Sequence, residues 1–443
     1  MKKCALISLF LLLTIPGFSQ SSFKIENSKG YFKQKFDLVN DLVILPVWVN
    51  GVELTFLLDT GINATIIFSL ESVDSLEVKN ATSIYLRGLG AGKPIPALKS
   101  LSNKVILGDA IDYDHSIYIL TEEVMELSSR LGVPVNGILG YEFFKDFIVE
   151  MNYPREFIKV YNPETYEYKR CRRCTDIPIR FHRNKPYLEA EVEMPDGSVK
   201  TINLLLDNGS GDAVWLFEDE ERQIKVPEKN FEDFLGFGIS GSVYGKRTRI
   251  NRLNLGDLEL REITVSFPDS LYIKDVKSFE DRDGSLGSRV MKRFHSVLDY
   301  PNKRLRLKPN RYFNDPFEYN MSGVVVEHKG YELKQARDFG YQPSFSIEAD
   351  PTGAVPVFES TYKLMFALEP QFRIAEIRPS SPAEMAGLKK GDIILKLNGR
   401  EAKNLSLEKI SGIFESREGR KIRLKIERDG VEKDFEFRLE RIL

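Results

Sequence analysis

Two aspartates have the sequence context of acid–base groups. Asp59 and Asp207 each follow an apolar run, and each begins a short motif that ends in glycine, Asp-Thr-Gly at 59–61 and Asp-Asn-Gly at 207–209. Such an aspartate is expected at a strand end, where a tight turn exposes the carboxylate beside a backbone N–H. Two carboxylates a few ångströms apart share one proton, so that one acts as base and the other as acid. This chemistry requires elements that bring Asp59 and Asp207 together.

Similar segments precede both aspartates. Residues 43–58 predict a hairpin that turns at Asn50-Gly51 and ends at Asp59. Residues 187–206 predict a second hairpin, which turns at 195–198 and ends at Asp207. The pattern indicates an internal duplication.

Further landmarks keep the same register. The offset of 148 residues between the aspartates also relates Gly88-Leu89-Gly90 to Gly236-Phe237-Gly238 and residues 107–109 to 255–257. An offset of 147 relates Gly137-Ile138-Leu139-Gly140 to Gly284-Ser285-Leu286-Gly287, and then Lys145, Phe147 and Tyr153-Pro154 to Lys292, Phe294 and Tyr300-Pro301. We expect a mainly β protein with lobe one at 30–165 and lobe two at 178–312, related by a pseudo-twofold that places the aspartates face to face.

Two elements of lobe one resemble those of a known enzyme family. Residues 56–61 and Gly137-Ile138-Leu139-Gly140 are similar to the catalytic loop and the apolar-apolar-glycine element of retroviral and pepsin-like aspartic proteases. The resemblance implies two duplicated retropepsin-like β-barrel lobes in which Asp59 and Asp207 activate a water against a peptide carbonyl, without metal or cofactor. It also implies catalytic-loop support from Thr60, Gly61, Asn208 and Gly209, and flaps around Gly88, Gly90, Gly236 and Gly238.

Lobe two departs from the family pattern at two positions. Asn208 replaces a Thr or Ser whose hydroxyl ties the two aspartate loops together in the family, and Ser285 replaces an apolar residue. An amide is longer than a hydroxyl and has a different donor and acceptor layout. An active endopeptidase, a peptide-binding protein that has lost catalysis, and a scaffold whose carboxylates only satisfy loops are therefore three alternatives.

The region 320–443 has a different, αβ pattern. Residues 372–377 predict a strand, and residues 381–388 predict a short helix with an N-cap Ser, Pro at the first helical position and a terminating Gly. Residues 381–392 together with Asn398-Gly399 resemble the core of bacterial PDZ domains, which implies capture of a peptide ligand between the strand 372–377 and a helix near 406–416. No clear Gly-Leu-Gly-Phe-like sequence precedes Phe372, and a domain that only packs against the lobes is the alternative.

The N-terminus predicts export. Lys2-Lys3 is followed by an apolar run of about 12 residues and then by small residues, which is typical of a signal peptide over 1–19 with cleavage after Ser19. Export would place the protein in the periplasm, on the cell envelope or outside the cell, and a retained membrane anchor is the alternative. No later stretch is long and apolar enough to cross a membrane.

Two cysteines remain after removal of the signal. Cys171 and Cys174 favour a local disulfide in an oxidising compartment, although two free thiols are possible. The four histidines are scattered, so no metal site is expected.

Length and composition are those of an ordinary multidomain globular protein. The chain has 443 residues, 42% of them hydrophobic and 29% charged, with a formal net charge of −2. Nothing indicates nucleic-acid binding, and the basic run at 169–173 favours a solvated surface. The partners we expect are polypeptide substrates and a peptide ligand of the C-terminal region.

Overall fold

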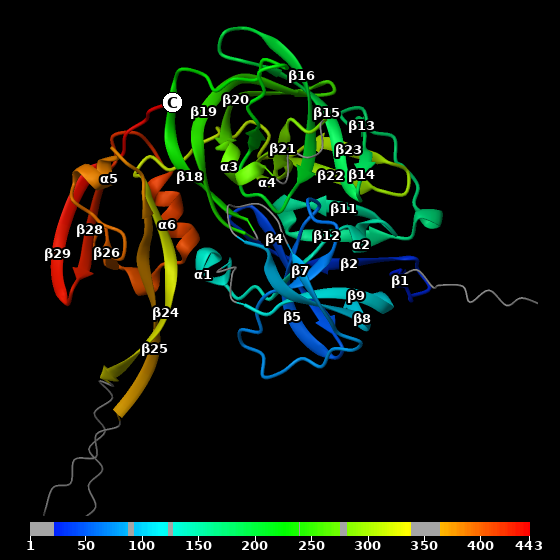
Figure 1. Cartoon of the computed structure of the whole chain (residues 1–443), viewed down its shortest axis with the longest axis horizontal. Helices are drawn as coiled ribbons and strands as arrows, with labels where there is room; N and C mark the ends of the chain where they lie inside the picture. Colours follow the sequence, from blue (N-terminus) through cyan, green and yellow to red (C-terminus); the bar gives the residue numbers. More distant parts are fainter. Residues whose placement is uncertain (1–21, 87–92, 123–126, 239, 275–280, 338–363) are drawn as a thin grey trace, which may run out of the picture.

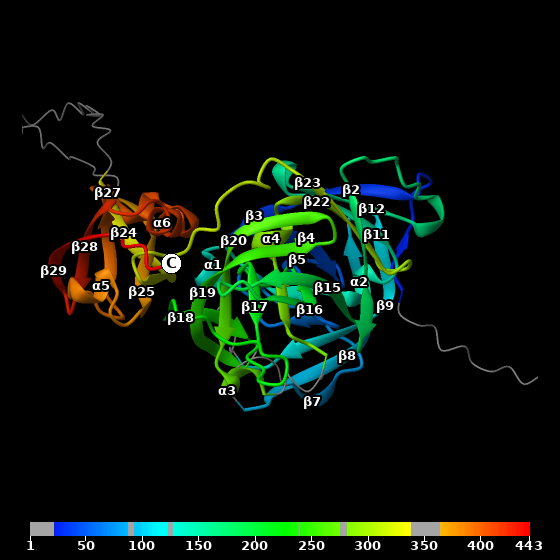
Figure 2. The same cartoon turned by 90° about the horizontal axis from the view of Figure 1, so that it is seen from above.

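The computed structural model describes residues 22–86, 93–122, 127–238, 240–274, 281–337 and 364–443. Two strand-rich lobes lie side by side, and a smaller domain formed by the C-terminal residues lies against one side of them (Figures 1 and 2). The predicted signal segment 1–19 lies outside the described residues. Among the described residues, no helix is both long and apolar enough to cross a membrane.

Lobe one is built on a sheet that contains the first predicted hairpin. Its strands run in the order β1-β9-β6-β10-β5-β4-β8-β7, with β3 added to β4. The bounds are β1 (Lys24–Ile25), β3 (Asp37–Val39), β4 (Leu42–Val49), β5 (Val52–Leu58), β6 (Thr65–Ile67), β7 (Thr82–Leu86), β8 (Ile95–Leu107), β9 (Ala110–Leu120) and β10 (Gly137–Leu139).

Lobe two repeats this arrangement. Its order is β14-β15-β16-β21-β17-β20-β19-β18. The bounds are β14 (Arg180–His182), β15 (Lys185–Glu193), β16 (Val199–Asp207), β17 (Val214–Leu216), β18 (Asn230–Gly238), β19 (Gly241–Leu255), β20 (Leu258–Pro268) and β21 (Gly284–Gly287).

The duplicated register of the sequence is also the register of the strands. In lobe one, β5 pairs in parallel with β10, and Phe56 lies opposite Gly137. In lobe two, β16 pairs in parallel with β21, and Leu204 lies opposite Gly284. These partners are related by the offsets of 148 and 147 residues found in the sequence. In each lobe a strand from the glycine element therefore supports the strand that leads to the aspartate.

A third sheet joins the lobes and was not predicted. Its order is β13-β23-β22-β11-β12-β2, with bounds Thr175–Pro178, Arg304–Pro309, Phe294–Asp299, Ile148–Asn152, Phe157–Tyr161 and Tyr31–Lys35. The central pair is β11 and β22, antiparallel, with Glu150 opposite Val297. These two residues are equivalents in the repeat, separated by 147 positions, so the pseudo-twofold axis passes between them.

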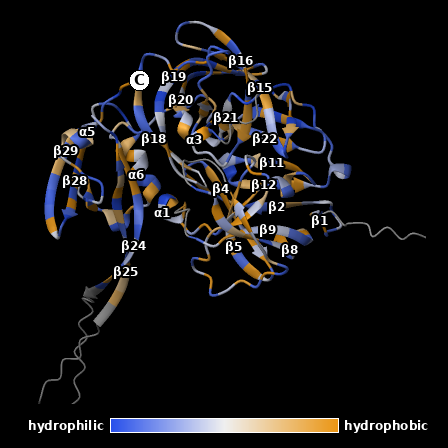
Figure 3. Ribbon diagram, in the orientation of Figure 1, coloured by the Kyte–Doolittle hydropathy of each residue, from blue (hydrophilic) through white to orange (hydrophobic). Residues whose placement is uncertain are grey.

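Apolar side chains on one face of this sheet join both lobes into one core. The buried cluster contains Val149 and Ile158 from lobe one and Leu298 and Leu305 from lobe two. The strands alternate in hydropathy along their length (Figure 3), as expected for sheets with one face packed on a core. The lobes are therefore not independent hydrophobic units.

The helices are short. They are α1 (Leu127–Leu131), α2 (Tyr141–Phe144), α3 (Ser270–Ile273), α4 (Ser288–Met291), α5 (Pro382–Met385) and α6 (Leu407–Phe414), with 3₁₀ turns at Tyr153–Arg155, Pro163–Thr165 and Ala402–Asn404.

The C-terminal domain has its own sheet and its own core. The sheet order is β24-β25-β26-β28-β29, with β27 paired to β26. The bounds are β24 (Val324–Arg337), β25 (Leu364–Ile377), β26 (Ile393–Leu397), β27 (Arg400–Glu401), β28 (Lys421–Arg428) and β29 (Val431–Arg438). Helix α6 covers this sheet with Leu407, Ile410 and Phe414, the helical face predicted from the sequence.

Arg293 organises the connection between lobe two and the C-terminal domain. Its side chain is fully buried. The guanidinium donates to the carbonyls of Tyr312 at 2.9 Å and Pro316 at 3.2 Å, and it lies 3.6 Å from the centre of the Phe317 ring. One charged group thus satisfies carbonyls of a segment that has no regular secondary structure.

We expect Arg293→Met to lower the free energy of unfolding by about 3 kcal/mol, because it leaves buried carbonyls without a donor. Urea unfolding followed by circular dichroism measures the change. Arg311→Met, which removes an exposed guanidinium from the same connection, is the matched control and should change stability by less than about 0.5 kcal/mol. Equal effects of the two substitutions would contradict the role of Arg293.

Candidate active site

The two predicted aspartates lie at corresponding strand ends. Asp59 directly follows β5, and Asp207 is the last residue of β16. In both lobes a parallel strand from the glycine element lies beside the strand that ends at the aspartate. The duplicated β-structure therefore presents two equivalent carboxyl groups at the junction between the lobes.

The glycines of the two motifs show how close the carboxyl groups are. A Cβ placed on Gly61 would lie 2.6 Å from Oδ1 of Asp207, and a Cβ on Gly209 would lie 2.3 Å from Cγ of Asp59. Each carboxyl group thus packs directly against the loop of the opposite lobe. No side chain fits at either glycine, and Asp59 and Asp207 face each other as the repeat predicts.

Thr60 and Asn208 fasten the two loops together. The Thr60 hydroxyl donates to the Leu206 carbonyl at 2.8 Å and accepts from the Asn208 backbone N–H at 3.0 Å. The Asn208 Oδ1 accepts from the Thr60 backbone N–H at 2.7 Å. Asn208 therefore supplies the cross-lobe acceptor that a hydroxyl would supply, and the loops remain connected in both directions.

The amide nitrogen of Asn208 takes no part in the hydrogen bonds between the two loops. Within the described chain, Asn208 Nδ2 and the hydroxyl of Tyr153 are buried and neither has a hydrogen-bond partner of regular geometry. The two groups are neighbours, because the Asn208 side chain acts directly on the Tyr153 hydroxyl. Burial raises the pKa of Tyr153, and Asn208 opposes that shift. The replacement of Thr or Ser thus adds a polar atom behind the loop and leaves the cross-lobe contacts intact.

Burial and mutual repulsion keep a proton on the aspartate pair. Burial and the charge of Asp207 raise the pKa of Asp59 to about 7. Burial also raises the pKa of Asp207, but the positive charges of Arg282 and Lys185 oppose this shift. The environments of the two carboxyls differ, since the positive charge of Arg282 acts to lower the pKa of Asp207.

Sequence reasoning missed the two cations. The Arg282 side chain is buried and donates to the Ser285 hydroxyl at 2.7 Å and to the Gly284 carbonyl at 3.1 Å. The hydroxyl of Ser285, the second departure from the family pattern, is thus an acceptor for this buried guanidinium. Lys185 is half-buried at the start of β15, and its pKa is lowered by burial and by Arg282.

The repeat contains a signal that could have identified both cations. The pairing of the strands makes Leu42 the lobe-one equivalent of Lys185, and the offset of 147 makes Val135 the equivalent of Arg282; both are buried. A charged residue that replaces a buried valine in one copy of a duplicated fold needs a partner, and the nearest conserved feature of the repeat is the aspartate loop. Comparison of charge between the two copies would have directed attention to these positions.

The predicted flap residues are described in lobe two only. Gly236 and Gly238 lie in β18, which forms a hairpin with β19 and has a register shift between Phe234 and Gly236. Gly236 has a φ of +146°, a conformation that favours glycine. Gly88 and Gly90 lie outside the described residues.

The predicted peptide-binding strand of the C-terminal domain is wrong. Phe372 and Arg373 in β25 pair with β24 on one side and with β26 on the other, so this strand has no free edge there. The edge strand is β24, and α6 lies next to it. The edge available for strand addition thus comes from residues that the sequence reasoning left unassigned.

Helix α1 of lobe one lies against β24 (Figure 1). Arg130 in α1 forms an ion pair with the buried Glu327 of β24 at 3.0 Å. A Cβ on Gly132, just after α1, would lie 3.1 Å from Cβ of Leu407, the first residue of α6. Lobe one therefore contacts both elements that flank the edge of the C-terminal sheet.

Arg130 also contacts the hairpin of lobe two. Its guanidinium lies 4.3 Å from the centre of the Phe237 ring. One side chain consequently touches lobe one, the β18–β19 hairpin and the C-terminal domain.

Other predicted groups lie apart from this site. A disulfide joins Cys171 and Cys174 in the segment between the lobes, with Cα atoms 5.5 Å apart. In the part of the chain that the structure describes, no group of three or more His, Cys, Asp or Glu is arranged to hold a metal ion.

Comparisons with known proteins agree with the two kinds of domain. A family model described as aspartyl protease matches residues 45–143, and one described as PDZ domain matches residues 357–439. Among solved structures, an aspartic proteinase from Irpex lacteus is similar, with 14% identity and a TM-score of 0.41 over 65% of this chain and 99% of that chain. No curated protein matches the sequence. The two family models thus assign an aspartyl protease domain to residues 45–143 and a PDZ domain to residues 357–439.

Proposed function

We propose that the protein is an exported aspartic-type endopeptidase whose PDZ domain captures polypeptides. The observation that supports catalysis most directly is the contact of Gly61 and Gly209 with the opposite carboxyl groups. It brings two half-buried carboxyls into one site that retains a proton near neutral pH. A pair with one acid and one base is what hydrolysis by an activated water requires.

Asp207 is assigned as the base and Asp59 as the acid. Arg282 and Lys185 favour the ionised form of Asp207, which takes a proton from water as the water oxygen bonds to the peptide carbonyl carbon. Protonated Asp59 gives its proton to the carbonyl oxygen. The resulting diol is neutral, and no covalent bond to the protein forms.

The second half of the reaction returns the protons. As the carbon–nitrogen bond breaks, Asp207 gives its proton to the leaving nitrogen, and Asp59 recovers a proton from a diol hydroxyl. The Thr60 and Asn208 hydrogen bonds keep both loops in place through these steps. Positioning of this kind supplies much of the rate enhancement in such reactions.

Export rests on two observations. The sequence of residues 1–19 has the pattern of a signal peptide, and the Cys171–Cys174 disulfide fits an oxidising compartment.

Peptide capture is assigned to the edge of β24 beside α6. An extended peptide adds a strand to such an edge through backbone hydrogen bonds. Because α1 lies against β24 and Arg130 binds Glu327, capture requires α1 to move. The same movement would separate Arg130 from Phe237 in the hairpin, so capture and the position of the hairpin are linked.

We expect Asp59→Asn and Asp207→Asn each to reduce hydrolysis of a diverse peptide pool by at least about 100-fold, because each removes one of the two proton-transfer groups. Mass spectrometry of the products measures the loss. The control is Asp257→Asn, which changes an exposed aspartate in the turn between β19 and β20 of lobe two and should retain activity. Peptide binding without cleavage by the unsubstituted protein at any pH would replace the enzyme proposal with a binding function.

Hydrolysis should decline as pH rises through about 7, because Asp59 then loses the proton it must donate. The folded pKa of Asp59 is higher than the unfolded value of 3.8, so protonated Asp59 stabilises the fold at low pH, and this contribution decreases between pH 4 and about 7. A profile of kcat against pH tests the first statement. An activity that stays constant to pH 9 would contradict it.

Lys185→Met should move the activity profile to higher pH. Removal of the cation raises the pKa of both Asp59 and Asp207, since Lys185 lowers both. Lys225→Met, which removes an exposed charge from the same lobe, should leave the profile unchanged. An unshifted profile in the Lys185 variant would show that its ammonium group does not act on the aspartates.

Arg130→Met should loosen both contacts of this side chain. We expect amide hydrogen exchange to rise about tenfold in β24 and in the β18–β19 hairpin, because an ion pair to a buried carboxylate is lost. Arg183→Met, at an exposed position, is the control. An increase in β24 alone would contradict the link to the hairpin.

A further inference from the structure

A large pocket lies on the sheet that joins the lobes, away from the aspartate loops. It has a volume of about 1220 Å³ and is lined by β11, β12, β22 and β23 together with the segment 165–174. The opposite face of these strands packs into the core through Val149, Ile158 and Leu305. Neither β5 nor β16, which lead to Asp59 and Asp207, contributes a lining residue.

The lining is strongly basic. Nine Lys or Arg residues and two Glu residues line the pocket, although the whole chain has a net charge of −2. Among the described residues, Arg306 pairs with Asp176, and the other eight cations have no carboxylate within ion-pair distance: Arg155, Lys159, Lys169, Arg170, Arg172, Arg173, Lys308 and Arg311. This concentration of one sign of charge is not a general property of the surface.

The charge also acts on a neighbouring group. Burial, Lys308 and Arg155 lower the pKa of His295, which lies in the lining. Of the two acidic residues, Glu150 is engaged by the hydroxyls of Tyr161 at 2.9 Å and Tyr166 at 3.2 Å. The pocket therefore has a positive potential that its own carboxylates do not neutralise.

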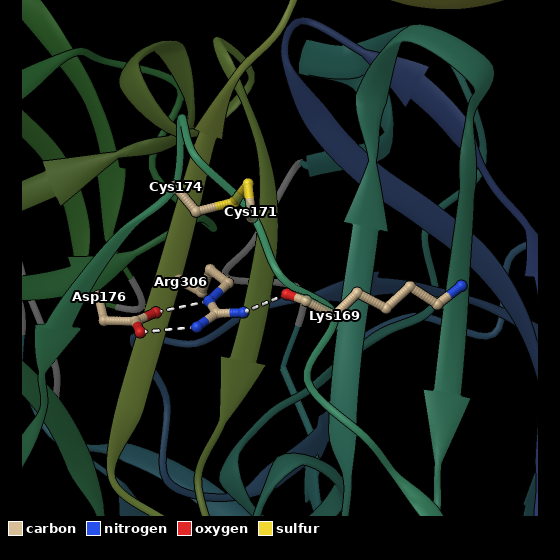
Figure 4. Close-up of a disulfide and its surroundings, with 5 residues drawn as sticks. All are labelled: Lys169, Cys171, Cys174, Asp176 and Arg306. Carbon is tan, nitrogen blue, oxygen red and sulfur yellow. Dashed lines mark hydrogen bonds and ion pairs between the residues drawn. A yellow bond between two sulfur atoms is a disulfide. The ribbon is translucent and has the colours of Figure 1, made fainter.

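A covalent and ionic clamp holds the arginine-rich loop in place. The Cys171–Cys174 disulfide closes a short loop that contains Arg172 and Arg173. Arg306 binds both oxygens of Asp176 at 2.6 and 2.7 Å on one side of this loop and the Lys169 carbonyl at 3.3 Å on the other (Figure 4). Holding these cations close together costs free energy, because like charges repel. Proteolysis at the aspartates does not require such a cluster of positive charge.

Aromatic rings form part of the same surface. Tyr31 stacks on Tyr161 with ring centres 5.5 Å apart, and Tyr161 contacts Tyr166 at 4.8 Å. All three residues line the pocket. A rigid apolar surface beside guanidinium groups suits a ligand whose anionic groups are attached to a larger body.

We propose that this pocket binds a ligand with clustered phosphate groups. Guanidinium groups bind phosphate through two parallel hydrogen bonds. Arg170, Arg172 and Arg173 lie within four residues, and a phosphate presents more charge in that space than a carboxylate of an acidic peptide does. The phosphates can belong to a soluble polyphosphate or to a phosphorylated lipid headgroup.

Binding of tripolyphosphate to the full-length protein by isothermal titration calorimetry tests the site. We expect Arg170→Gln/Arg172→Gln/Arg173→Gln to weaken binding at least tenfold and higher salt to weaken it further. The control is Lys225→Gln/Lys229→Gln/Lys274→Gln, which removes three exposed charges elsewhere and should leave the affinity unchanged. Cys171→Ser/Cys174→Ser retains every charge and should weaken binding by a smaller factor.

The source of the phosphate is separated by flotation with vesicles. The protein should bind vesicles of phosphatidic acid but not vesicles of phosphatidylcholine, and the arginine variant should lose this binding. That result supports the site, and if tripolyphosphate binds only weakly it assigns the site to a lipid headgroup. Tight tripolyphosphate binding supports it and assigns a soluble ligand. Tighter binding of a hexaglutamate peptide than of tripolyphosphate would overturn the phosphate assignment. Equal affinities of the arginine variant and its control would overturn the site itself.

Discussion

The structure depends on two carboxyl groups held together inside the protein. Asp59 and Asp207 are each packed against a glycine of the opposite loop. Two negative charges cannot remain there, so the pair retains a proton. The surrounding features follow from this constraint: loops without side chains at Gly61 and Gly209, cross-lobe hydrogen bonds from Thr60 and Asn208, and nearby cations.

The duplication makes the two sides of the site similar. The positions at which the two copies carry different residues make the two carboxyl groups differ. A symmetric pair would share its proton equally. Lobe two instead places Arg282 where lobe one has Val135, and Ser285 accepts a hydrogen bond from it. Both departures from the protease pattern that seemed to threaten catalysis thus have a structural use: Ser285 holds a cation near Asp207, and the oxygen of Asn208 preserves the connection to Thr60.

The sequence predicts contacts that repeat and misses those that occur once. The offsets between copies predicted the duplication, and the structure shows the same relation in the pairing of β5 with β10 and of β16 with β21. The joining sheet was missed because its strands pair across the two copies. Arg130 was missed as well, since its contacts with Glu327 and Phe237 join three regions far apart in the chain and leave no periodic pattern. The peptide edge was predicted at 372–377, in β25, because the sequence reasoning left the residues of β24 unassigned.

The joining sheet also separates two kinds of chemistry. One face contributes to the core that fixes the lobes and thereby the aspartates, and it requires apolar side chains such as Val149 and Leu305. The other face is free of that requirement, and there the same strands display His295 and Lys308. Substitutions on the outer face therefore change charge without changing the positions of Asp59 and Asp207. A basic pocket could arise on this face while the catalytic geometry was retained, and this explains why the basic run at 169–173, expected to be only a solvated surface, forms part of a defined pocket.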